Sequence, residues 1–140
     1  MTIGVVEDNA DLVKALTYAL SEIGHQVVTA PSGAALLARL GENPPNLIIS
    51  DYRLAGNEDG FNVIATLRKN FGSQLPALII TGDTDPEVIR RMARKRIVVL
   101  HKPVSLDVLR SRIAELTGAE AKLADSAEQP LETSQQELCR

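Results

Sequence analysis

Short apolar runs alternate with longer amphipathic stretches along this chain, and the alternation occurs five times. Runs rich in β-branched residues, which are typical of strands, lie at 2–6, 26–30, 46–50, 77–80 and 97–100. Three of them are apolar at consecutive positions, at residues 3–6, 47–49 and 78–80. Strands that are covered on both faces need this pattern, which favours a parallel sheet with helices on both sides.

The amphipathic stretches predict helices. In the first of them Leu12, Leu16 and Ala19 repeat at helical spacing and form one apolar face. The predicted helices cover residues 10–23, 32–40, 61–71, 86–94 and 105–116. Ser32 is an expected N-cap, and Asp85 followed by Pro86 is the usual start of a helix.

Five repeats of strand and helix in about 118 residues predict a doubly wound α/β fold. Functional residues of such a fold gather outside the carboxyl ends of the strands. From Gly118 onward the pattern stops, and Ala, Glu, Gln and Ser dominate. We therefore expect one domain over residues 1–118 and a disordered, polar, acidic tail over residues 119–140.

The composition is ordinary for a soluble globular protein. The 140 residues are 44% hydrophobic and 24% charged, and the apolar runs are far too short to span a membrane. The first residues do not resemble a secretory signal, and the single cysteine, Cys139, has no partner for an internal disulfide. We expect a cytoplasmic protein without membrane insertion.

The net charge of −3 is unevenly distributed. Residues 120–140 contain five acidic and two basic side chains, so the remaining 119 residues are neutral overall. Within this neutral part, five basic side chains are packed into residues 90–96. A solvated helix surface explains this cluster somewhat better than a docking patch, and the composition as a whole does not indicate direct nucleic-acid binding.

Polar side chains follow four of the predicted strands. Glu7 and Asp8 follow the first strand, Asp51 the third, Thr81 the fourth and Lys102 the fifth. Each has a simpler explanation, since Asp8 could cap a helix, Asp51 or Thr81 could begin a loop, and Lys102 could be solvated. In a parallel sheet, however, all these strand ends lie at one edge.

Their combination is what indicates chemistry. Carboxylates about 5 Å apart repel each other by about 3 kcal/mol at an effective dielectric constant of 20. A bound cation or a raised pKa must relieve this repulsion. Oxygen ligands with room for water suit Mg²⁺, while Lys102 and the Thr81 hydroxyl suit phosphoryl oxygens. The set predicts phosphoryl transfer to a carboxylate.

Residues 5–9, 48–54, 79–82 and 101–104 resemble the signature segments of receiver domains of bacterial response regulators, the CheY-like superfamily of two-component systems. The similarity covers about residues 2–117, with these segments in family order and at family-like separations. It implies a flavodoxin-like fold with five helices and a five-stranded parallel sheet in strand order 2-1-3-4-5.

The resemblance also implies a role for each residue. Asp51 would be the phosphoacceptor, and Thr81 and Lys102 would contact the phosphoryl group. Mg²⁺ or Mn²⁺ would be held by Glu7, Asp8, Asp51 and the backbone carbonyl of Arg53. Residues that flank the site are Gly82, Asp83, Pro103 and Val99, and the Lys102–Pro103 peptide bond is often cis in the family.

The phosphoryl donor would be a histidine kinase or a histidine phosphotransfer protein, and a downstream protein would recognise the phosphorylated surface. Such a domain, a monomer or weak dimer, accepts a phosphoryl group but is not an independent turnover enzyme. Residues 51–54, 81–84 and 100–104 are most similar to carboxyl-terminal receivers of hybrid sensor histidine kinases, although a free-standing regulator also fits.

Two departures from the family pattern bear on signalling. Val99 occupies the position three before the lysine, where many members carry an aromatic switch residue. A coupled switch of threonine and aromatic ring is therefore not expected, and signalling would run through Thr81 and residues 82–85. Arg53 and Asp83 could form an ion pair that sets the lifetime of the acyl phosphate, although both could equally be solvated.

Three other interpretations are weighed against this one. The first is a receiver-like interaction module that is never phosphorylated. The second, an aspartate-nucleophile phosphatase, would need a second aspartate where Arg53 stands. The third, a flavin-binding protein, would need a first loop that cradles phosphate, whereas residues 7–10 would repel phosphate unless a cation intervened.

Overall fold

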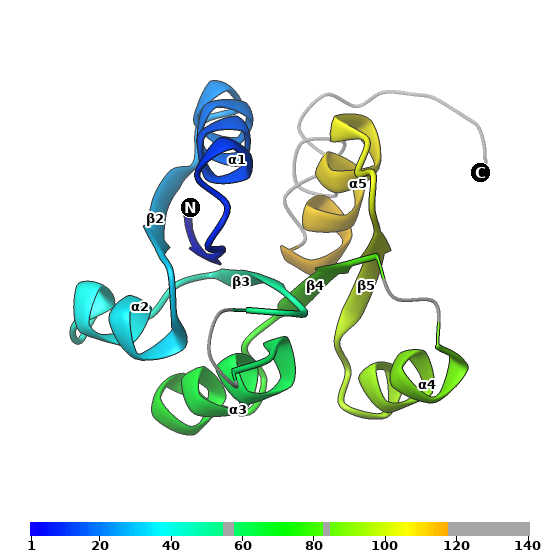
Figure 1. Ribbon diagram of the computed structural model, residues 1–140. Coiled ribbons are helices and arrows are strands. Elements are labelled where there is room, and N and C mark those ends of the chain that lie inside the picture. Colours follow the sequence, from blue (N-terminus) through cyan, green and yellow to red (C-terminus); the bar gives the residue numbers. More distant parts are fainter. Residues whose placement is uncertain (55–57, 83–84, 118–140) are drawn as a thin grey trace, which may run out of the picture.

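The computed structural model describes residues 1–54, 58–82 and 85–117. Within them five strands alternate with five helices, as the hydrophobic pattern predicts (Figure 1). In chain order the elements are β1 (Thr2–Val6), α1 (Ala10–Glu22), β2 (Gln26–Ala30), α2 (Gly33–Leu40), β3 (Leu47–Asp51), α3 (Gly60–Phe71), β4 (Ala77–Thr81), α4 (Pro86–Arg94), β5 (Val98–His101) and α5 (Leu106–Thr117).

The five strands form one parallel sheet in the order β2-β1-β3-β4-β5. This is the strand order that the resemblance implies, so the predicted doubly wound fold is confirmed. The chain first builds outward from β1 to β2 and then crosses back to β3 on the other side of β1. The carboxyl ends of β1 and β3 therefore flank the point where the winding reverses, which is where such sheets bind ligands.

Helices cover both faces of the sheet (Figure 1). Helices α1 and α5 lie on one side, and α2, α3 and α4 lie on the other. Successive strand residues point to opposite faces, so Ile48 and Ile79 pack beneath α2, α3 and α4 while Ile49 and Leu78 pack beneath α1 and α5. All four side chains are fully or almost fully buried, which explains why these strands are apolar at consecutive positions.

Polar side chains cap four of the helices. The Asn9 side chain accepts hydrogen bonds from the backbone N–H groups of Asp11 and Leu12, at 3.0 and 3.1 Å. Ser32, Asp59 and Asp85 cap α2, α3 and α4 in the same way. The expected caps Ser32 and Asp85 are confirmed, and because Asn9 caps α1, the neighbouring Asp8 carboxylate is left for another role.

The last three strands each extend one residue beyond the predicted end. Asp51, Thr81 and His101 are the final residues of β3, β4 and β5. The ladder continues because the Tyr52 N–H donates to the carbonyl of Ile80 at 3.0 Å, and the Lys102 N–H donates to the carbonyl of Thr81 at 2.8 Å. The polar residues at these ends are thus held by the sheet itself.

Part of the chain lies outside the described residues. The predicted tail at 119–140 belongs to it, as do residues 55–57 and 83–84, so the boundary of the domain at residue 118 stays a prediction. None of the helices in the described part of the chain combines the length and the apolar character that a membrane crossing requires.

Candidate functional site

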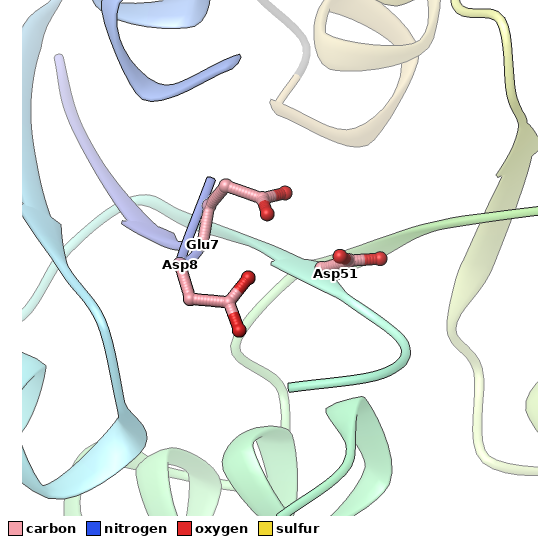
Figure 2. A group of neighbouring side chains, drawn as sticks. All are labelled: Glu7, Asp8 and Asp51. Atoms are coloured by element: carbon pink, nitrogen blue, oxygen red, sulfur yellow. The ribbon is translucent and has the colours of Figure 1, made fainter. Parts of the chain in front are cut away.

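Three carboxylates converge at the carboxyl edge of the sheet. Glu7 and Asp8 follow β1, Asp51 ends the neighbouring strand β3, and one oxygen from each lies within 4.8 Å of the other two (Figure 2). Glu7 and Asp51 are only 4% and 8% exposed, whereas Asp8 is open to solvent. The structure therefore brings together the three acidic residues that the strand ends predicted, with one side of the cluster accessible.

Lys102 completes this cluster from a strand two places away. It follows β5, and its ammonium nitrogen lies 3.3 Å from Oδ2 of Asp51. The Lys102–Pro103 peptide bond is cis, as the resemblance leads us to expect. The Lys102 side chain is 40% exposed, so its charge reaches Asp51 from the solvent side of the site.

Burial and mutual repulsion disfavour full ionisation of the three carboxyl groups. The pKa of Glu7 is raised to about 7, chiefly by burial and also by the charges of Asp51 and Asp8. The Asn9 N–H, which donates to Oε2 of Glu7 at 3.1 Å, and the charge of Lys102 lower this pKa and only partly offset the rise. A carboxylate held in this way takes up a proton near neutral pH unless a cation neutralises the cluster.

The donor set fits a hard divalent cation. All three side chains offer oxygen atoms, and the exposed Asp8 leaves room for water ligands. Mg²⁺ prefers such sites, with a few carboxylates and several retained waters. Glu7, Asp8 and Asp51 are thus able to hold the metal ion that the sequence predicted, and the bound ion would relieve their repulsion.

Of the remaining predicted site residues, Thr81, Gly82 and Pro103 lie at the same edge of the sheet. Thr81 is buried at the end of β4, and the register of β3 with β4 pairs Asp51 with Ile80, one residue before it. Gly82 and Pro103 follow their strands at the surface, while Asp83 lies outside the described residues. Val99 is a half-buried residue of β5 that packs against the core beneath α2, α3 and α4.

The segment after Asp51 is fixed by a contact that the sequence analysis missed. The Gly60 N–H donates to the carbonyl of Tyr52 at 2.8 Å, and Arg53 and Asp59 form an isolated antiparallel bridge. A Cβ atom on Gly60 would lie 2.9 Å from the carbonyl oxygen of Asp51. Only glycine therefore lets α3 begin so close to Asp51, and a glycine directly after an N-cap residue is the signal that could have indicated this.

A row of aromatic and basic side chains runs from this segment to α4. The Arg53 guanidinium lies 5.3 Å from the centre of the Tyr52 ring, and the Tyr52 ring packs edge-to-face on Phe61 at 5.7 Å. Arg91 of α4 lies over the Phe61 ring, 4.2 Å from its centre. The predicted ion pair of Arg53 with Asp83 stays a prediction, because Asp83 is outside the described residues.

A parallel doubly wound sheet with an acidic cluster at its switch point and a lysine beside the central aspartate is the arrangement expected of a receiver domain. Comparison with known proteins gives the family, because residues 3–114 match the response regulator receiver domain. The chain belongs to this family. The resemblance inferred from the signature segments is thereby confirmed.

Known relatives agree with this membership. The chain is 36% identical over 125 residues to the transcriptional regulatory protein AfsQ1 of Streptomyces coelicolor, an alignment that covers 88% of this chain and 54% of that protein. A response regulator receiver domain protein from Clostridium thermocellum shares the fold, with a TM-score of 0.74 and 23% identity over 87% of this chain and 98% of that one.

The relatives do not single out one type of parent protein. The sensor histidine kinase TmoS of Ectopseudomonas mendocina is 28% identical over 113 residues, which are 80% of this chain and 12% of that protein. The chain spans about half the length of AfsQ1 and a smaller share of TmoS. The special similarity to receivers of hybrid kinases therefore stays a prediction.

Proposed function

We propose that Asp51 accepts a phosphoryl group from the phosphohistidine of a histidine kinase or histidine phosphotransfer protein, in a reaction that depends on Mg²⁺ or Mn²⁺. The observation that carries this proposal is the cluster of Glu7, Asp8 and Asp51 with Lys102 on the Asp51 carboxylate. Membership in the receiver family supports it, and the segments that resemble the family signatures contain these four residues.

The residues of the site would have separate roles in the transfer. Glu7, Asp8, Asp51 and the backbone carbonyl of Arg53 would hold the divalent ion, which when bound supplies positive charge that offsets the negative charge of the transferring group. One Asp51 oxygen attacks the phosphorus atom as the bond from phosphorus to the histidine nitrogen breaks, and the freed imidazole keeps the electron pair of that bond. Attack from this buried carboxylate is directed because the sheet fixes Asp51 and Lys102 orients its Oδ2 atom.

Lys102 then changes partner. Its ammonium group lies 3.3 Å from Asp51 before transfer and would move to an oxygen of the new phosphoryl group afterwards. The Thr81 hydroxyl, at the end of the adjacent strand, would donate a hydrogen bond to another phosphoryl oxygen. Both residues thereby respond to the same event from β4 and β5.

The response would spread from these two residues to the protein surface. The phosphoryl group adds about −1.5 to −2 charge, and drawing Thr81 and Lys102 toward it favours one of two pre-existing arrangements of residues 82–104. Helix α4 lies within this segment and α5 follows it, and together they would form the surface that a downstream protein reads. Val99 lacks a ring, so movement of an aromatic side chain on β5 is not part of the mechanism.

The test is labelling of the full chain with acetyl phosphate and Mg²⁺, followed by intact mass measurement. We expect one added phosphoryl group, which disappears in Asp51→Asn and when EDTA replaces Mg²⁺. Asp107→Asn on α5 is the matched control, since that carboxylate is 94% exposed and should leave labelling unchanged. Labelling that persists in Asp51→Asn contradicts the proposal, and no labelling of the wild type favours a receiver-like interaction module that is never phosphorylated.

Arg53 provides a second test, of the lifetime of the acyl phosphate. If an ion pair with Asp83 shields the phosphoryl group from water, Arg53→Ala should lose the group faster than the wild type. The measurement is the decay of the phosphorylated mass after the phosphodonor is removed. Equal decay rates in the two proteins would refute a role for Arg53.

The proposal extends to the chain as a whole. We assign residues 1–118 to the receiver domain and residues 119–140 to an acidic tail. We place the protein in the cytoplasm, where kinases form phosphohistidine, as a monomer or weak dimer that is not itself a turnover enzyme. Sedimentation of the full chain over a range of concentrations tests the oligomeric state, and a stable tight dimer would contradict it.

A further inference from the structure

A groove of about 420 Å³ lies between α3 and α4, away from the acidic cluster. Apolar side chains, including Phe61, Ile64 and Ile97, form part of its lining. The basic side chains that line it are Arg68, Arg91, Arg94, Lys95 and Arg96. The cluster of basic residues that the sequence places at 90–96 thus contributes four of its members to one side of an apolar groove.

The fold holds several of these cations in place. The Arg68 guanidinium donates hydrogen bonds to the backbone carbonyls of Leu75, Lys95 and Arg96, at 3.0, 2.6 and 3.0 Å. Arg91 is held by its position over the Phe61 ring, at 4.2 Å. Burial lowers the pKa of Arg68, and the positive charge of Arg96 lowers it further. Arg68 and Arg91 therefore hold positive charge at fixed places in the groove.

This positive charge is not balanced by acidic side chains in the part of the chain that the structure describes. The residues that line the groove include neither aspartate nor glutamate. The ion pairs found among the described residues use Arg90, Lys102, Arg110 and Arg112, and leave the basic residues of the groove out. An anionic ligand would relieve the mutual repulsion of these cations while its apolar parts fill the floor.

The same chain contains a segment with the complementary pattern. Residues 120–140 carry the entire net charge of the chain, and their acidic residues at 128 and 132 flank the apolar Leu131. Glu132 is 15 residues beyond the end of α5 at Thr117, and an extended chain covers about 50 Å over that length. A folded domain of this size is roughly 35 Å across, so the segment is long enough to pass around the sheet.

We propose that the groove between α3 and α4 binds the acidic segment 120–137 of the same chain, with Glu128 and Glu132 on the basic rim and Leu131 on the apolar floor. A nucleic-acid backbone is the weaker candidate, because residues 1–119 are neutral overall and the chain as a whole carries a net charge of −3. The proposal does not depend on phosphorylation, and its test uses the unphosphorylated protein.

The single cysteine gives direct access to this contact. Cys139 lies seven residues beyond Glu132, so a nitroxide spin label attached to it reports where the segment goes. In the ¹⁵N-labelled full chain we expect the label to broaden the amide signals of residues 91–97 and of the second half of α3 more than those of α1 and β2. At about 0.5 M NaCl, where the Debye length is about 4 Å, the broadening should largely disappear.

Charge reversal then identifies the two sides of the contact. Glu128→Lys with Glu132→Lys should abolish the broadening, and so should Arg94→Glu with Lys95→Glu. The four substitutions together should restore it, because the charges are exchanged. Lys14→Glu with Lys69→Glu is the matched control, since it changes the net charge equally at exposed residues outside the groove lining and should leave the broadening unchanged.

The outcomes are distinct. The substitutions at 128 and 132 alter none of the described residues, so they test the contact even where the groove variant fails to fold, which circular dichroism detects. Broadening that is equal in the wild type and in the Glu128 and Glu132 variant overturns the proposal. A second outcome also overturns it: the label leaves the amide signals of α4 unchanged, but these signals shift when a short DNA duplex or a separate acidic peptide is added. The groove is then a binding site for another molecule.

Discussion

Glu7 offers the most direct measurement of the electrostatic strain in the acidic cluster. The residue is 4% exposed, and burial, followed by the neighbouring carboxylates, raises its pKa from 4.5 to about 7 in the metal-free protein. The change to make is Glu7→Gln, because an amide has nearly the same shape as a protonated carboxyl group but cannot ionise. The free energy of unfolding of both proteins is then compared over pH.

The sign follows from proton binding. Because the folded state holds the Glu7 proton more tightly than the unfolded state does, the stabilisation is complete below pH 4.5 and is lost as the pH rises through about 7. The full shift corresponds to about 3 kcal/mol. Between about pH 5.5 and about pH 8.5 the wild type should lose about 2 kcal/mol relative to Glu7→Gln.

Urea unfolding in the presence of EDTA measures this difference, with Glu22→Gln at the exposed end of α1 as the control for the substitution of a glutamate elsewhere. Titration of groups remote from Glu7 is common to the proteins and cancels in the comparison. If the stabilities of wild type and Glu7→Gln changed in parallel with pH, the burial of Glu7 would not perturb its ionisation, and the electrostatic account of the site would be wrong.

Three further predictions address the proposed metal site and its support. Mg²⁺ must displace the Glu7 proton, so its affinity, measured by calorimetry, should be about tenfold weaker at about pH 6 than at about pH 8, and an affinity that does not change with pH contradicts this. Lys102→Met removes a positive charge 3.3 Å from Asp51, so Mg²⁺ should bind about threefold to tenfold more tightly while labelling by acetyl phosphate becomes slower; weaker Mg²⁺ binding would show that Lys102 does not compete with the ion. Gly60→Ala should lower the free energy of unfolding in urea by about 1–3 kcal/mol, because the new Cβ would lie 2.9 Å from the Asp51 carbonyl oxygen. The same change usually stabilises a helix, so a stabilised variant would show that α3 can shift away from Asp51.

The sequence alone determined the order and type of the elements. Consecutive apolar residues in the first, third and fourth strands can only be buried from both sides, and the helical stretches carry one apolar face each. These properties are local, so they can be read from neighbouring positions along the chain. The capping residues Ser32 and Asp85 were predictable for the same reason, since a cap acts within three residues.

The candidate residues of the site were also predictable, because parallel strands place their carboxyl ends at one edge. Knowing that Glu7, Asp8, Asp51 and Lys102 follow strands was enough to expect them together. The strand ends themselves were placed one residue short, since the polar Asp51 and Thr81 interrupt the apolar runs while the backbone ladder continues. Hydrogen bonding of the backbone does not require apolar side chains.

Only the tertiary structure decided the contacts between elements that are far apart in sequence. The pKa of Glu7 depends on burial beneath other elements, and the need for glycine at position 60 depends on the carbonyl of Asp51 nine residues earlier. The groove lined by Arg68 of α3 and Arg91 of α4 also depends on the tertiary structure, because the sequence shows the basic run but not the apolar side chains beside it. Distances between side chains on different elements follow from how helices pack on the sheet, and a pattern along one segment carries no information about its neighbours in space.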